Sequence, residues 1–116
     1  MINKIVLAFA IISLVVACAS KQHKNKPSNG IGIMFYNMEN FFDTIDDPKT
    51  SDEEYLPMGN KRWNTDKYNR KTKNICEVIT KINDGKLPHL LGVCEIEHKS
   101  ILTNIIKNLP NSNYSI

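Results

Sequence analysis

Phe35-Tyr36-Asn37-Met38-Glu39-Asn40 closes an apolar run that begins at Ile31, and Leu90-Leu91-Gly92-Val93-Cys94-Glu95 closes a second apolar run on a carboxylate. In the first run both alternating faces are largely apolar, which predicts a strand covered on both sides. The second run, His89 to Cys94, has the same character. We therefore expect two buried strands that carry oxygen-bearing side chains, above all Asn37 and Glu95, to the edge of a sheet.

Helical periodicity fills the segment between the two runs. Residues at helical spacing form one face: Tyr68, Thr72, Ile75, Ile79 and Ile82. This pattern predicts a helix from about Asp66 to Asn83, with Thr65 as its N-cap and Gly85 as its C-cap. A strand, a helix and a strand in this order predict a parallel pair joined by a right-handed crossover. Asn37 and Glu95 should then meet at the rim where open α/β sheets bind ligands.

A second helix should follow, from about Lys99 to Asn108. Its inward positions are all apolar: Ile101, Leu102, Ile105, Ile106 and Leu109. Pro110 stops this helix, and Tyr114-Ser115-Ile116 is typical of the opening of a third strand. Because a domain rarely finishes on the opening of a strand, we expect residues 31–116 to be the truncated first portion of a larger domain.

Residues 1–17 are typical of a secretion signal. The apolar run from Ile5 to Val16 is too short to span a bilayer as a helix. It ends in Val15-Val16-Ala17-Cys18, which resembles the lipobox of bacterial lipoproteins, so we expect a lipid on Cys18. A buried amino-terminal helix and a signal cut elsewhere are the alternatives. Residues 18–30 are expected to form a flexible tether. The protein should then be anchored in the cell envelope, at the periplasmic face of the outer membrane, without an obligate protein partner.

Composition and charge narrow the function only slightly. The 116 residues include 15 Lys and Arg against 12 Asp and Glu, which gives a formal charge of +3. This composition does not indicate a specialised nucleic-acid-binding protein. Basic residues nevertheless cluster from Lys61 to Lys73. This cluster, with Arg70, could contact a phosphate or could be a solvated helix face. Cys76 and Cys94 could pair in a periplasmic setting, but their apolar surroundings favour two buried free cysteines.

Several polar residues have both a functional and a structural interpretation. Glu95 could anchor Mg²⁺, which prefers carboxylate and amide oxygens, or could be a solvated carboxylate at a strand end. Asn37 could act at a ligand site or simply form a turn. Glu39 and Glu97 could be surface acids, and His98 is expected to cap or flank the second helix.

The segment Asp43–Asn60 carries six acidic residues without a helical or strand period. A loop of this length inside a compact domain is usually functional or disordered. Its carboxylates could hold calcium, but their spacing does not match an EF-hand, so a solvated loop is the expected structure.

Together these segments resemble a known family. Phe35-Tyr36-Asn37-Met38-Glu39-Asn40-Phe41-Phe42-Asp43, followed by Leu91-Gly92-Val93-Cys94-Glu95-Ile96-Glu97, is similar to the endonuclease/exonuclease/phosphatase superfamily, closest to its bacterial lipoprotein-like members. The resemblance covers residues 31–116 and includes Asp52-Glu53-Glu54 and Trp63. It implies an α/β fold, here the N-terminal part of a four-layer α/β sandwich in which two sheets are flanked by helices.

The resemblance also implies a site. Asn37 would orient a metal-bound phosphate, Glu95 would be the principal metal ligand, and Glu39 would support the metal. The cofactor would be Mg²⁺ or Mn²⁺, and the reaction would be hydrolysis of a phosphoester: a nucleic acid, a phospholipid head group or a small phosphoester. In the family a His–Asp pair activates water. Cys94 stands where the family usually has Gln, which puts the surroundings of the metal in doubt.

Two family segments, Asp-x-Asn and Ser-Asp-His, do not occur in residues 31–116, and no histidine there stands next to an aspartate. We therefore expect this chain alone to be catalytically inactive and poorly folded, with an apolar sheet face left exposed. Two other functions stay open at this point. One is a small lipid-anchored binding or scaffold protein without catalysis, and the other is a calcium-binding surface lipoprotein that uses the acidic loop.

Overall fold

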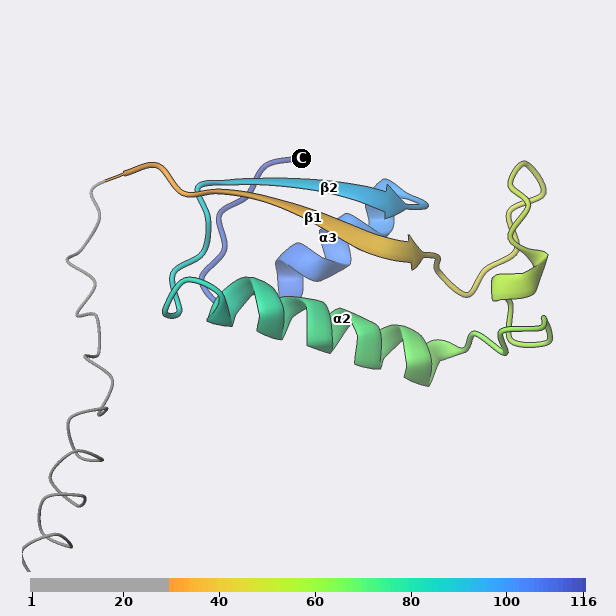
Figure 1. Ribbon diagram of the computed structural model, residues 1–116. Coiled ribbons are helices and arrows are strands. Elements are labelled where there is room, and N and C mark those ends of the chain that lie inside the picture. Colours follow the sequence, from red (N-terminus) through yellow and green to blue (C-terminus); the bar gives the residue numbers. More distant parts are fainter. Residues whose placement is uncertain (1–29) are drawn as a thin grey trace, which may run out of the picture.

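The structure is a computed structural model that describes residues 30–116 (Figure 1). The predicted signal segment 1–17, the lipidation site Cys18 and nearly all of the tether 18–30 lie outside the described residues. The described chain forms, in order, strand β1 (Ile33–Phe41), the 3-10 turn η1 (Glu53–Tyr55), helix α2 (Thr65–Lys81), strand β2 (Leu90–Ile96) and helix α3 (Lys99–Asn108). Within residues 30–116, neither helix has the length and apolar character needed to cross a membrane.

The fold is mixed α/β, as predicted, and its two strands pair in parallel. Ladder pairing runs from Ile33 beside Leu90 to Asn37 beside Cys94, and resumes where Phe41 lies beside Ile96. Three residues of β1 therefore face one residue of β2 across an enlarged bulge. Strand β1 therefore extends past Asn37 to Phe41, because pairing resumes beyond this bulge.

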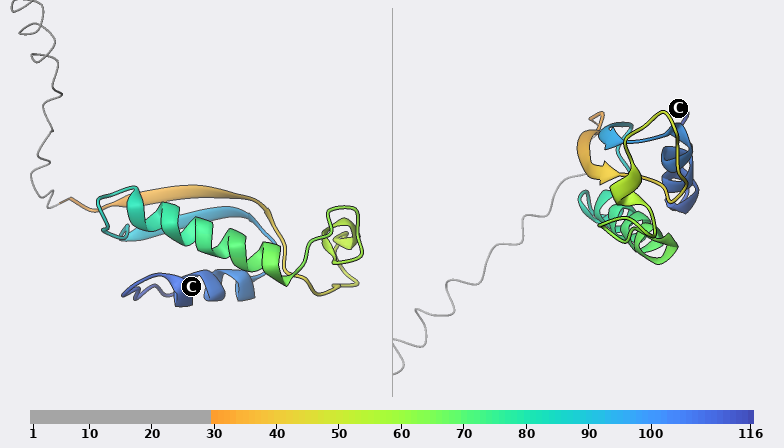
Figure 2. Two further views of the ribbon diagram at one scale, coloured as in Figure 1. Left: turned by 90° about the horizontal axis from the view of Figure 1, so that it is seen from below. Right: turned by 90° about the vertical axis from the view of Figure 1, so that its right-hand side faces the viewer.

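Both helices pack on the same side of the sheet, as the two views of Figure 2 show. The core between them and the strands is formed by eight buried side chains: Met38, Phe41, Ile75, Cys76, Ile79, Ile101, Ile105 and Leu109. Phe41, Ile79 and Ile105 have no exposed surface at all. This core is continuous from the end of β1 through α2 to α3, so it holds the carboxyl end of the sheet in place.

The opposite face of the sheet is bare in the described residues. Ile33 is 70% exposed, Phe35 is 72% exposed and Leu90 is 59% exposed. The prediction that β1 is covered on both sides is therefore wrong for residues 30–116, because α2 and α3 share one face. The predicted exposed apolar face is confirmed. Phe35 lies over Gly92, where a Cβ would come within 2.9 Å of the Phe35 ring.

The helix ends differ in detail from the prediction. Asn64, not Thr65, is the N-cap of α2, and its side-chain oxygen accepts a hydrogen bond from the Lys67 amide at 3.0 Å. Ile82 was expected to face inward but is 66% exposed, because the helix ends at Lys81 and Ile82 is already its C-cap. Gly85, with φ of +83°, follows three residues later and does not cap the helix.

The second helix, α3, has the predicted bounds, and Ile101 and Ile105 are buried as expected. Tyr114 to Ile116 form no strand within the described residues; instead the Tyr114 hydroxyl donates a hydrogen bond to the Pro88 carbonyl. Cys76 and Cys94 are both free, as predicted, although Cys94 is only partly buried.

The segment Asp43–Asn60 is more ordered than the sequence suggested. It contains η1, and Phe42 stacks on Tyr55 with ring centroids 4.1 Å apart. The Trp63 indole donates a hydrogen bond to the Phe42 carbonyl at 2.9 Å. These contacts fix the loop beside the carboxyl end of β1, where the candidate site lies.

Candidate functional site

Asn37 and Glu95 meet at the carboxyl end of the parallel strands, where the sequence placed them. The Asn37 amide Nδ2 donates a hydrogen bond to Glu95 Oε1 at 2.7 Å, and the Asn40 backbone N–H donates to Glu95 Oε2 at 3.2 Å. Both side chains are exposed to solvent. A carboxylate and an amide are thus held together at an open rim, and we call this pair with Glu39 and Lys71 the rim site.

The backbone of the rim site adopts an uncommon conformation. Glu39, Asn40 and Glu95 have φ of +52°, +54° and +55°. Non-glycine residues in this left-handed region cost free energy and gather at functional sites. The Glu39 backbone N–H donates to Asn37 Oδ1 at 2.7 Å, which locks the Asn37 side chain. The bulge therefore has two effects: its Asn40 N–H points toward Glu95, and its Glu39 N–H orients the Asn37 side chain.

Lys71 joins this rim from α2 and was not singled out from the sequence. Its ammonium donates to the Glu39 carbonyl at 2.7 Å and lies over the rings of Phe41 at 5.0 Å and Trp63 at 5.5 Å. Burial lowers the pKa of Lys71, and the negative charges of Glu39 and Glu95 oppose that shift. The helical pattern places Lys71 outside the predicted apolar face, and its position one turn before Ile75 was the signal that could have identified it.

A cavity of about 200 Å³ opens between β1 and α2 at this rim. Its lining includes Asn37, Glu39 and Lys71. Arg70, the predicted phosphate contact, is exposed on α2 and makes no hydrogen bond or ion pair with the rim site within residues 30–116. The roles of Asn37, Glu39, Glu95 and Arg70 stay predictions.

A second group of acidic residues lies beside the rim site. Glu97 Oε2 accepts a hydrogen bond from the Asp43 backbone N–H at 2.9 Å. Burial raises the pKa of Glu97, the hydrogen bond from Asp43 partly opposes this, and the Asp43 charge raises it further. The interpretation of Glu97 as a surface acid is therefore wrong, since its side chain is only 2% exposed.

His98 occupies the N-cap position of α3 but makes no side-chain capping hydrogen bond. Its Nε2 lies 3.5 Å from Asp47 Oδ2 instead. A histidine and an aspartate that are distant in sequence thus meet in space, which a search for adjacent residues could not find.

The prediction that the acidic loop is solvated is only partly correct, because Asp52 is 2% exposed while Asp46 and Glu53 face solvent.

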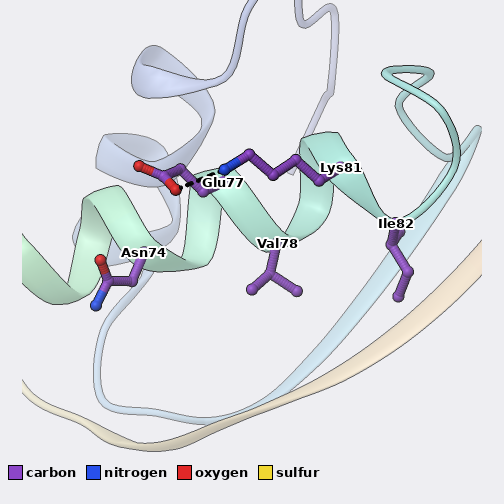
Figure 3. Close-up of a pocket in the computed structure, with 5 residues that line it drawn as sticks. All are labelled: Asn74, Glu77, Val78, Lys81 and Ile82. Carbon is purple, nitrogen blue, oxygen red and sulfur yellow. Dashed lines mark hydrogen bonds and ion pairs between the residues drawn. The ribbon is translucent and has the colours of Figure 1, made fainter.

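A larger hollow, of about 500 Å³, lies along α2 away from this chemistry. In Figure 3 the side chains of Val78 and Ile82 point to one side of α2. Glu77 and Lys81 form a 2.9 Å ion pair along the other side of the helix. The hollow contains none of the rim residues. We therefore regard the rim as the candidate site, because Asn37, Glu39 and the Lys71 ammonium line the smaller cavity there and Glu95 lines a second one with Asn40.

A model of the endonuclease/exonuclease/phosphatase family matches residues 32–116, which include both strands, both helices and every residue of the rim site. The chain belongs to the endonuclease/exonuclease/phosphatase family. No curated protein and no solved structure matches it. Membership of this family indicates a hydrolase of the phosphoesterase type, and members of the family generally depend on divalent metal ions.

Proposed function

We propose that this member of the endonuclease/exonuclease/phosphatase family is a metal-dependent phosphoester hydrolase, a nuclease or a phosphatase, that uses Mg²⁺ or Mn²⁺. Glu95 would hold the cation, Glu39 would support it, and Asn37 would orient the phosphate. The observation that carries this proposal is the 2.7 Å hydrogen bond between Asn37 and Glu95 at the bulged end of two parallel strands. Open α/β folds bind their ligands at this carboxyl end of a parallel sheet.

The residues of the rim site fit a hard divalent cation. Each Glu95 oxygen accepts one hydrogen bond and keeps further acceptor capacity for a metal ion. A bound Mg²⁺ would supply neutralisation of the phosphate and of the charge that develops on the leaving group. Asn37 has a second amide N–H left to donate to a phosphate oxygen, and Lys71 keeps ammonium donors beyond the one that binds the Glu39 carbonyl.

We expect Lys71, rather than Arg70, to contribute to phosphate binding. A charge-assisted hydrogen bond of this kind is worth about 1.5–3 kcal/mol, so Lys71→Met should weaken inhibition by inorganic phosphate by about 10- to 100-fold. The matched control Arg70→Met, one residue away and exposed, should change it less than about 2-fold. Inhibition constants and thermal unfolding midpoints would be measured on the native gene product. Equal effects of the two substitutions would contradict the assignment of Lys71.

We further propose that the 116-residue chain supplies only the first part of the catalytic domain and is inactive alone. Support comes from the two family segments missing from residues 31–116, Asp-x-Asn and Ser-Asp-His, and from the bare apolar face of the sheet. The purified chain should show no Mg²⁺-dependent hydrolysis of a phosphodiester such as bis(p-nitrophenyl) phosphate. Robust turnover that Glu95→Gln abolishes would contradict this.

The lipobox supports a second proposal, a lipid anchor on Cys18 in the cell envelope.

A further inference from the structure

Two segments converge beside the rim site and bring Asp43, Glu97 and His98 together. The loop after β1 provides Asp43, and the short connection between β2 and α3 provides Glu97 and the N-cap residue His98. One ligand atom from each of the three residues lies within 4.8 Å of the others. His98 Nε2 is 3.7 Å from Glu97 Oε1, and the Asp43 backbone N–H donates to Glu97 Oε2 at 2.9 Å. The geometry is that of a ligand set drawn from two segments that are distant in the sequence.

Two carboxylate oxygens in and beside this group are buried without a hydrogen-bond partner. Glu97 Oε1 is one, on a side chain that is 2% exposed, and the 3.7 Å to His98 is too long for a hydrogen bond. The other is Oδ1 of Asp52, a residue that is also 2% exposed. Its second oxygen accepts from the Asp47 backbone N–H at 3.2 Å. A buried, unpartnered carboxylate oxygen is costly, so each points to a missing positive partner.

The charges of this region do not balance. Asp43, Asp47, Asp52 and Glu97 surround one imidazole, that of His98. Within residues 30–116, the ion pairs formed by lysine join Lys61 to Glu54 and Lys81 to Glu77, and none reaches these four carboxylates. One imidazole cannot balance four carboxylates, and the charges of the two buried ones, Asp52 and Glu97, persist only when they are paired or coordinate a cation.

We propose that Asp43, Glu97 and His98 bind a second divalent cation, separate from the one at Glu95 and independent of it. Ca²⁺ and Mg²⁺ take oxygen ligands, whereas imidazole with carboxylates suits a transition-metal ion such as Mn²⁺ or Zn²⁺. The cation ties the loop after β1 to the end of β2 and the start of α3. Glu97 also lines a cavity of about 190 Å³ together with Asn40 and Glu95, so this cation fixes one wall beside the rim site.

The test is a Mn²⁺ titration of the full chain after removal of metal, with free Mn²⁺ followed by electron paramagnetic resonance. Glu97→Gln and His98→Gln should each weaken one Mn²⁺ site by at least about 10- to 100-fold, the loss typical when partners of a metal site are removed. Two controls should retain that site: Glu95→Gln, which removes the ligand at the rim, and Asp46→Asn, which removes an exposed charge from the same loop. Retention in Glu95→Gln would separate this cation from the proposed catalytic one.

A second readout guards against variants that merely fail to fold. Without metal, Glu97→Gln should have a thermal midpoint equal to or above that of the wild-type chain, because it removes a buried charge that lacks a partner. Saturating Mn²⁺ should raise the wild-type midpoint by about 4 °C or more beyond any rise in Glu97→Gln, which keeps the site at Glu95 but loses this one. The proposal is overturned if Glu95→Gln binds no Mn²⁺, if Glu97→Gln and Asp46→Asn bind equally well, or if His98→Gln leaves the affinity unchanged.

Discussion

Glu95→Gln is expected to reduce phosphoester hydrolysis by the native gene product by about 100- to 1,000-fold, the range seen when one preorganised electrostatic group of an active site is removed. Gln keeps the size of Glu, and its side-chain carbonyl can still accept the hydrogen bond from Asn37 Nδ2, but its amide nitrogen cannot accept the one from the Asn40 N–H. The rim therefore keeps its shorter hydrogen bond and loses the negative charge that would hold the cation. The Mg²⁺ concentration needed for half-maximal rate should rise by at least about 10- to 100-fold.

The matched control for this prediction is Glu53→Gln, which removes an exposed glutamate charge from the turn η1 without touching the rim site. Its rate and Mg²⁺ requirement should equal those of the wild-type protein within about 2-fold, because exposed charges act weakly across solvent. Steady-state kinetics over a range of Mg²⁺ concentrations would check both variants. A Glu95→Gln protein that keeps the wild-type rate and Mg²⁺ requirement would show that Glu95 holds no catalytic cation.

Phe41→Ala should cost about 3–5 kcal/mol of unfolding free energy, the usual range for removing a buried phenyl ring. Phe41 has no exposed surface, and its ring centroid lies 5.2 Å from that of Tyr68 and 6.3 Å from that of Trp63. Because the 116-residue chain is expected to fold poorly, its total stability should lie at or below the low end of the about 5–15 kcal/mol of native proteins. The substitution should therefore remove most of the cooperative unfolding transition and the anchor of the bulge that orients Asn40.

Phe35→Ala is the matched control in the same strand. Phe35 is 72% exposed on the bare face of the sheet, so its loss should change the unfolding free energy of the 116-residue chain by less than about 1 kcal/mol. Urea unfolding followed by circular dichroism would compare the two variants. Equal destabilisation by the two substitutions would contradict a structure in which both helices pack on one side of the sheet and Phe35 lies exposed on the other.

The sequence predicted the elements well where hydrophobic periodicity was strong. Helix α3 has the predicted bounds because its apolar residues repeat over the whole helix and Pro110 follows its end. The parallel pairing followed from the order strand, helix, strand, and it correctly brought Asn37 to Glu95. The cap of α2 was missed by one residue, since Asn64 and Thr65 are both good N-caps and only the backbone geometry distinguishes them.

The features of the site that the sequence did not predict depend on contacts between residues far apart in the chain. The bulge at Glu39 and Asn40 has no local signal, because neither is the glycine that usually marks a left-handed backbone. Lys71 differs from its basic neighbours only in the side of α2 on which it lies, beside Phe41 and Trp63. The pairing of His98 with Asp47 likewise requires the loop after β1 to fold back on the start of α3.

The most direct test of the central claim is phosphodiester hydrolysis by the native gene product after its metal has been removed, measured without and with added Mg²⁺. The rim site of Asn37, Glu39, Glu95 and Lys71 predicts no turnover until Mg²⁺ is added, saturable recovery in the wild-type protein, and little recovery in Glu95→Gln at the same Mg²⁺ concentration. Full turnover in the metal-free protein, or identical recovery in the two proteins, would contradict a catalytic cation at Glu95.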